Sequence, residues 1–220
     1  MAVAAASRGI PTLFLSLEES VARVTRRLVS CRSGVPYRRL ADGLPLAEEE
    51  RDEVEQALAW LDGLPLDVLS VETLKSLDEE TVCGAVAAAT AAVVVVDHVQ
   101  KVSTGGESRQ YGIERVMNRL HAAALRDRRV VVVCAQLNRE SENERRAPRL
   151  SDLRDSGSIE IMARKVLLLY WPFKHDATRD RYEYQIHVAK QSTGGTGVVD
   201  VRFRAETGTF WDDPAQNIRS

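Results

Sequence analysis

Four consecutive valines, Val93 to Val96, followed directly by Asp97, constrain the fold of this 220-residue chain more than any other feature. Because valine is branched at Cβ, such a run resists the α-helix and favours a β-strand, and a strand that is apolar on both sides needs cover on both faces. The run from Val130 to Ala135 has the same character. The sequence therefore predicts a mostly parallel sheet between layers of helices.

Short apolar runs alternate with longer amphipathic stretches, an alternation that is typical of α/β proteins. The earlier strands are expected over residues 12–17 and 65–71. Helices are expected over residues 20–32, 47–62, 78–92 and 110–127. The charged stretch 139–149 is expected to be a mobile loop. Later strands, joined by short turns that favour antiparallel pairing, are expected over residues 166–170, 182–189, 198–204 and 209–211.

Composition excludes several classes of protein. With 44% hydrophobic and 28% charged residues, the chain is expected to be globular. A net charge of -2 excludes a globally basic nucleic-acid coat, so any DNA contact must be local. No apolar run approaches the ~20 residues of a membrane span, and we expect a cytoplasmic protein. Three widely spaced cysteines, expected to be buried, indicate neither a zinc site nor a disulfide framework: Cys31, Cys83 and Cys134.

Polar side chains follow three of the predicted strands. Glu18 follows the first strand, Asp97 the valine strand and Gln136 the next one. Parallel strands present their carboxyl ends at one edge, where a carboxylate can polarise water, another can bind Mg²⁺ and a carboxamide can contact a phosphate. Taken singly, Asp97 can equally cap a helix, Glu18 can favour a helix dipole and Gln136 can be an ordinary polar residue after a strand. The combination favours a functional site.

Four blocks of the sequence resemble the RecA-like motor domain of DnaB-type replicative DNA helicases. They are Phe14-Leu15-Ser16-Leu17-Glu18, the valine strand with Asp97-His98-Val99-Gln100, Gln136-Leu137-Asn138-Arg139, and Leu150-Ser151-Asp152-Leu153-Arg154-Asp155-Ser156-Gly157-Ser158-Ile159-Glu160. The resemblance covers nearly the whole chain. It implies a RecA-like α/β fold with a mostly parallel central sheet, flanking helices and an antiparallel C-terminal extension.

The same resemblance implies roles for the strand-end residues, with ATP and Mg²⁺ as cofactors. Glu18 would be the general base that orients the attacking water. Asp97 would be the Mg²⁺-binding carboxylate, and Gln136 the phosphate sensor.

A further implied site is the loop from Ser151 to Ser158, which faces single-stranded DNA in the central channel of a hexameric ring in this family. Arg154, Asp155 and Gly157 would lie near the DNA, where a guanidinium can pair with a phosphate and glycine permits close backbone approach. The plainer alternative is a surface ion pair of Arg154 with Asp152 or Asp155, with Gly157 as a turn residue.

Lys190 and Gln191 resemble the start of the family's Lys-Gln-Arg-Asn-Gly turn, in which Lys and Arg reach the γ-phosphate bound by the neighbouring subunit. Ser192 stands at the position of that arginine, and a neutral hydroxyl cannot replace a cationic fork. A generic hairpin with glycine turns is the alternative interpretation of this segment.

The clearest departure from the family is that residues 1–220 contain no G-x-x-x-x-G-K-[ST] P-loop. Residues 2–6 resemble the end of the helix that follows the P-loop, so residues 1–220 are expected to form a single motor domain without its first strand and P-loop. The chain is then part of a helicase or a diverged relative. The main hypothesis is an ATP-dependent DNA helicase motor. The alternative is a degenerate RecA-like domain that binds DNA or helicase subunits without hydrolysing ATP, and the weakest is a recombinase-like or clock-type relative.

Overall fold

The computed structural model describes residues 1–106, 108–138 and 144–212. The chain divides into two compact units, Met1–Gln136 and Leu137–Ser220, and each is considered by itself. Among the described residues, no helix combines the length and the apolar character that crossing a membrane requires.

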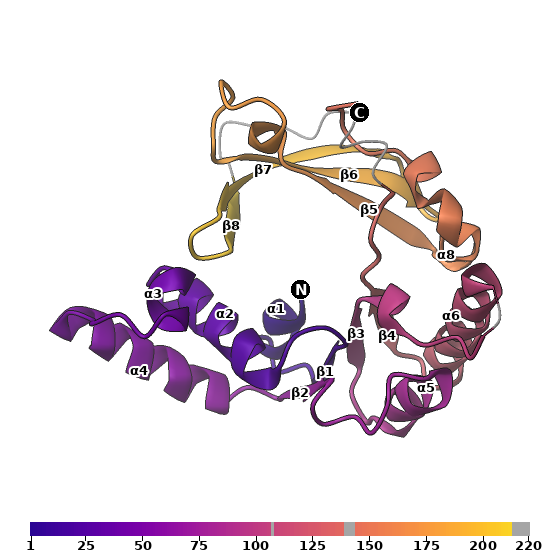
Figure 1. The fold of residues 1–220 in the computed structure, drawn as a ribbon, viewed down its shortest axis with the longest axis horizontal. Coiled ribbons are helices and arrows are strands. Elements are labelled where there is room, and N and C mark those ends of the chain that lie inside the picture. Colours follow the sequence, from indigo (N-terminus) through magenta and orange to yellow (C-terminus); the bar gives the residue numbers. More distant parts are fainter. Residues whose placement is uncertain (107, 139–143, 213–220) are drawn as a thin grey trace. The chain divides into compact units, whose positions relative to one another are not determined.

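The first unit is built on a four-stranded parallel sheet with the strand order β2-β1-β3-β4 (Figure 1). Its strands are β1 (Thr12–Ser16), β2 (Leu66–Ser70), β3 (Val93–Asp97) and β4 (Val130–Val133). In β3, Val94 and Val96 have no exposed surface and Val95 is 4% exposed. Both faces of this strand are therefore covered, as the run of valines predicts.

Helices connect and flank these strands. They are α1 (Ala2–Ala6), α2 (Val21–Ser33), α3 (Tyr37–Ala41), α4 (Glu48–Asp62), α5 (Glu79–Ala88), the 3₁₀ turn η1 (Val99–Lys101) and α6 (Arg109–Arg126). The side chain of Ser20 caps α2 by accepting a hydrogen bond from the backbone N–H of Arg23, and Gly34, with φ of 77°, ends that helix. Helix α6 buries Ile113, Val116 and Leu120 at helical spacing.

The second unit contains an antiparallel sheet with the order β5-β6-β7-β8. Its elements are the 3₁₀ helix η2 (Leu150–Ser156), α8 (Gly157–Met162), β5 (Lys165–Tyr170), η3 (Pro172–Lys174), β6 (Glu183–Gln191), β7 (Gly197–Arg204) and β8 (Thr209–Asp212). Aromatic side chains pack across neighbouring strands, with the rings of Phe203 and Phe210 4.5 Å apart and that of Tyr184 5.1 Å from each. The predicted change from parallel to antiparallel pairing is confirmed.

Several local predictions are wrong. Helix α5 ends at Ala88 rather than at residue 92, because Ala89 is extended and the chain turns to let the N–H of Ala92 bond the carbonyl of Pro11. Strand β4 ends at Val133 rather than at residue 135. Helix α3 was not expected. Cys31 is exposed, since it lies on the outer side of α2, whereas Cys83 is buried.

Candidate functional site

The register of the parallel sheet brings two of the expected residues to one edge. Ser16 of β1 pairs with Asp97 of β3, and one residue further the N–H of Leu17 donates to the carbonyl of Asp97 at 2.7 Å. Glu18 follows immediately. Backbone hydrogen bonds between strands therefore fix the neighbouring positions of Glu18 and Asp97.

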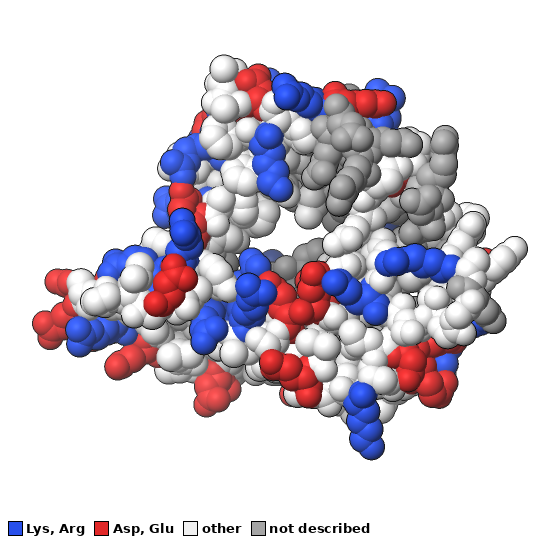
Figure 2. Space-filling model, viewed as in Figure 1, with Lys and Arg blue, Asp and Glu red and all other residues white. Residues whose placement is uncertain are grey.

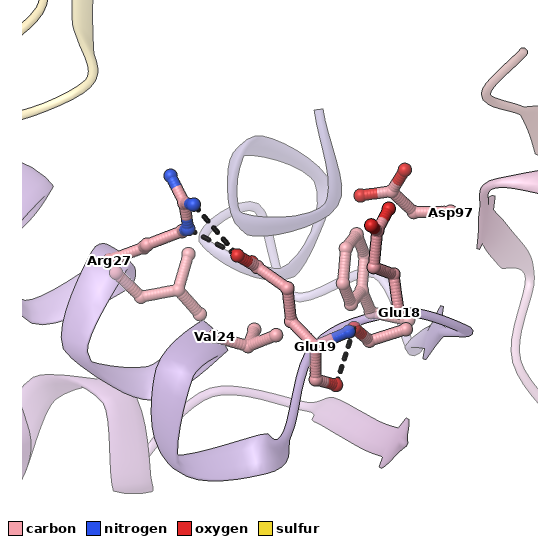
Figure 3. A pocket seen from close by; sticks show the side chains of 8 residues that line it. Glu18, Glu19, Val24, Arg27 and Asp97 are labelled. Atoms are coloured by element: carbon pink, nitrogen blue, oxygen red, sulfur yellow. Dashed lines mark hydrogen bonds and ion pairs between the residues drawn. The ribbon is translucent and has the colours of Figure 1, made fainter. Parts of the chain in front are cut away.

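A tight turn carries the chain from β1 into α2. The hydroxyl of Ser16 donates to the carbonyl of Glu19 at 2.8 Å and accepts from its N–H at 3.2 Å, a contact that Figure 3 shows. Glu18 is on this turn, and half of its side chain is exposed. One carboxylate oxygen of Glu18 is 3.3 Å from Nδ1 of His98 and the other is 3.2 Å from Nζ of Lys101. The carboxylate is thus held in place and still open to water.

A pocket of about 500 Å³ lies beside this turn. It is lined by Phe14, Ser16, Glu18, Glu19, Val24, Arg27, Leu28 and Asp97. The guanidinium of Arg27 donates to both carboxylate oxygens of Glu19, at 2.9 and 2.7 Å (Figure 3), and lies 5.1 Å from the centre of the Tyr37 ring. The charge of Glu19 is therefore largely balanced by Arg27, whereas Glu18 and Asp97 give the pocket its acidic character.

The carboxyl group of Asp97 has a raised pKa. Burial is the main cause, and the carboxylates of Glu19 and Glu18 add to it, while His98 and Arg27 act in the opposite direction. A carboxylate that is costly to ionise in the empty pocket gains more from a cation there.

Asp97→Asn is expected to stabilise the protein in the absence of divalent cations. Because the pKa of Asp97 is higher in the folded than in the unfolded state, the folded state loses stability as the pH rises through the folded pKa, and the amide removes that loss. We expect a rise of about 2 °C in the unfolding temperature at pH 7 and a smaller one at pH 5, measured by thermal unfolding. The control is Asp67→Asn, at an exposed position of β2. An unchanged or lower temperature at pH 7 would contradict the prediction.

Gln136 also lies at the carboxyl edge of the parallel sheet. It follows β4, which pairs with β3 from Val93↔Val130 to Val96↔Val133, and the residue is exposed. Its backbone N–H and carbonyl are both bonded to the side chain of Gln100. The first unit therefore presents all three expected strand-end residues at one edge of its sheet.

The donor set suits a divalent cation that keeps other ligands. Among the described residues, no group of three or more His, Cys, Asp or Glu side chains is arranged to hold a metal ion. Mg²⁺ is commonly held by one or two carboxylates, with waters and substrate phosphates completing its coordination. Asp97 fits that role.

In the second unit, the expected DNA-binding segment is helical rather than a loop. Arg154 and Asp155 belong to η2, and their side chains lie outside the described residues. Gly157 begins α8 with φ of -50°, a conformation open to any residue, so the predicted turn glycine is wrong. The helical backbone pairs its own donors and acceptors, which is why this segment is not extended.

Asp152 anchors this helical segment. It is 1% exposed, and its carboxylate accepts two hydrogen bonds from the guanidinium of Arg146, at 2.8 and 3.0 Å, and one from the N–H of Arg149. The pairing with Arg146 lowers the pKa of Asp152. The surface pair of Arg154 with Asp152 is therefore wrong. Of the predicted loop 139–149, residues 139–143 lie outside the described residues, and Arg146 belongs to this buried ion pair.

Lys190 and Gln191 make local contacts in the second unit. Nζ of Lys190 donates to the carbonyl of Glu160 at 2.7 Å and to that of Ile161 at 3.3 Å, at the end of α8. Nε2 of Gln191 donates to the carbonyl of Thr193, and Ser192 donates from both its N–H and its hydroxyl to the carbonyl of Arg164. These contacts join the hairpin to α8.

The model of the family described as "DnaB-like helicase C terminal domain" matches residues 1–212. The chain belongs to this family. It is 29% identical over 216 residues to the replicative DNA helicase DnaB of Leifsonia xyli subsp. xyli, an alignment that covers 95% of this chain and 47% of the relative. It is 28% identical over 221 residues to a probable replicative DNA helicase of Trieres chinensis, covering 92% and 47%. The chain thus spans about half the length of these curated relatives.

Solved structures share the fold. One of them, an isolated ATPase domain, superposes with a TM-score of 0.86 at 20% identity, covering 96% of this chain and 78% of that one. A DnaB-like replicative helicase, solved in a study of its interactions with primase, gives 0.84 at 21% identity and covers 94% and 52%. The RecA-like α/β fold expected from the sequence is confirmed.

Sequence reasoning missed several residues around the DnaB-like site. His98 and Gln100 lie within the block that contains Asp97, so their distance from Asp97 in the sequence was a usable signal. Arg27 lies two helical turns into α2, and Arg146 lies in a stretch that was expected to be loop. No sequence spacing identifies those two partners.

Proposed function

We propose that this chain is the motor domain of a replicative DNA helicase, which hydrolyses ATP with Mg²⁺ and moves along single-stranded DNA as part of a hexameric ring in the cytoplasm. The observation that carries the proposal is the carboxyl edge of the parallel sheet, where the bond from Leu17 to Asp97 places Glu18 and Asp97 beside an acidic pocket. Membership of the DnaB-like family supports the same activity. We further propose that both units belong to one motor domain, residues 1–220, without its first strand and P-loop.

Each residue at this edge has a distinct proposed task. Glu18, held by His98 and Lys101 and half exposed, accepts the proton of an attacking water and orients it. Asp97 would hold Mg²⁺, which supplies charge neutralisation on the phosphates. Gln136 donates a hydrogen bond from its carboxamide to a phosphate oxygen.

Lys190 and Gln191 have a proposed role toward ATP in the neighbouring subunit of a ring. For that, the amine of Lys190 must leave the carbonyls of Glu160 and Ile161, or reach the phosphate while it stays bonded to one of them. This engagement, with serine at residue 192, favours the second candidate function, a domain that binds DNA or helicase subunits without hydrolysis.

For DNA, we propose that the segment from Ser151 to Ser158 contacts the phosphate backbone, with Arg154 as the cation and with Asp155 and Gly157 beside it. The buried Asp152 and its partner Arg146 would hold this segment in its helical form. Positive and negative side chains are interspersed on the face shown in Figure 2, which supports a local rather than a general DNA contact.

Phosphate release with and without single-stranded DNA separates the two functions. The test protein carries a homologous strand, P-loop and helix before residue 2, because residues 1–220 contain no P-loop sequence. A motor domain is expected to release phosphate faster with DNA, and Asp97→Ala is expected to remove that release. DNA binding without any hydrolysis would instead support the non-hydrolysing function.

A further inference from the structure

Strands β3 and β4 continue side by side after their regular pairing ends at Val96 and Val133. The N–H of Cys134 donates to the carbonyl of Val96 at 2.9 Å, and the N–H of Val99 donates to the carbonyl of Cys134 at 3.1 Å. Beyond this point the chain of β3 turns into η1, so its backbone is no longer available to the chain that follows β4. Gln136 lies just past the last of these backbone contacts.

The side chain of Gln100 supplies the next pair of hydrogen bonds. Its Oε1 accepts from the N–H of Gln136 at 3.1 Å, and its Nε2 donates to the carbonyl of the same residue at 3.1 Å. A neutral carboxamide carries both an acceptor and a donor, so it can satisfy both polar groups of one peptide backbone residue. Carboxylates and ammonium groups offer only one kind of bond.

Gln100 is itself held from the other side. Its backbone carbonyl accepts a hydrogen bond at 2.7 Å from the guanidinium of Arg109, the first residue of α6. The N–H of Lys101, the next residue, is bonded to the carbonyl of His98. The side chain of Gln100 therefore reaches Gln136 from a backbone that α6 and η1 keep in place.

We propose that Gln100 is a positioning residue, whose carboxamide clamps the backbone of Gln136 to the strand end that carries Asp97. The two glutamines lie 36 positions apart in the sequence. With its backbone fixed, the exposed side chain of Gln136 leaves the sheet from a defined point beside Asp97. The catalytic consequence rests on the proposed function, in which Asp97 holds Mg²⁺ and Gln136 contacts a phosphate.

Amide hydrogen exchange of the 220-residue protein tests the clamp directly. In Gln100→Ala, the protection factor of the Gln136 amide is expected to fall about tenfold, because its acceptor is lost, while the amides of β3 keep theirs. Gln100→Glu gives the sharper result. Its ionised carboxylate faces the carbonyl of Gln136 and repels it, whereas the neutral acid offers one donor and one acceptor like the native carboxamide.

Protection of Gln136 in Gln100→Glu should therefore be low at pH 7.5 and recover toward the native value at pH 5, while Gln100→Ala stays low at both. This recovery separates a specific clamp from a general loss of packing. If Gln136 is equally protected in the native protein and in both variants, or if Gln100→Glu shows no recovery while the amides of β3 remain protected, the clamp is refuted.

The consequence for hydrolysis is measured in the P-loop-bearing protein. Gln100→Ala is expected to lower kcat about tenfold and to leave the Kd for Mg²⁺-ATP unchanged, because Gln136 is misplaced while Asp97 is not. An unchanged kcat would refute the positioning role. Since the exchange experiment needs no hydrolysis, the clamp and the proposed function can fail separately.

Discussion

Glu18→Gln is expected to lower kcat for ATP hydrolysis by about 10²- to 10⁴-fold, which is the range that a positioned general base contributes. The measurement uses the protein with a homologous strand, P-loop and helix before residue 2. The carboxamide keeps the size of the side chain and can still accept hydrogen bonds from His98 and Lys101, which contact Glu18 at 3.3 and 3.2 Å. It cannot take a proton from water. The Kd for Mg²⁺-ATP, measured by calorimetry, should stay within about threefold.

Glu19→Gln is the matched control. Glu19 lines the same pocket, but its carboxylate is bonded through both oxygens to Arg27, so it is not placed to accept a proton from water. This variant should keep most of the hydrolysis. If Glu18→Gln loses binding and hydrolysis equally, Glu18 has a structural role, and if Glu19→Gln is the more damaging change, the base has been assigned to the wrong carboxylate.

The parallel sheet and its functional edge follow from local features of the sequence. A run of valines with no polar residue cannot be satisfied at a solvent-exposed position, so the covered strand β3 could be predicted from Val93 to Val96 alone. Once the strands are parallel, the residues that follow them must share an edge, which places Glu18, Asp97 and Gln136 together. These inferences need only residue type and order.

The side-chain pairings at the site required the structure. The contact between Gln100 and Gln136 depends on where two chain segments diverge after their strands, and no periodicity encodes that point. Asp152 was expected at the surface because charged residues surround it in the sequence, yet Arg146 allows its burial by supplying two hydrogen bonds. Ends of helices shifted for a similar reason, since α5 stops where Ala92 must bond to Pro11.

Arg154→Ala is expected to weaken the binding of single-stranded DNA by about tenfold, the effect of losing one charge-assisted contact with a phosphate. The physical reason is the net charge of -2, which leaves affinity to a few local cations. Each phosphate contact on a single strand adds about 0.7 to the slope of log affinity against log salt, so the slope should fall by about that amount. Fluorescence anisotropy of labelled oligonucleotides across a salt titration measures both quantities.

The control for Arg154 must remove the same charge elsewhere in the second unit. Arg179→Ala does so at an exposed ion pair with Glu183, and it should leave both affinity and salt slope nearly unchanged. Because a backbone contact reads no bases, the effect of Arg154→Ala should be similar on oligonucleotides of different sequence and equal length. In a ring, six such segments would act together, so the loss should grow with oligomerisation. If Arg154→Ala and Arg179→Ala behave alike, the segment from Ser151 to Ser158 does not bind phosphate, and Arg154 is a surface residue.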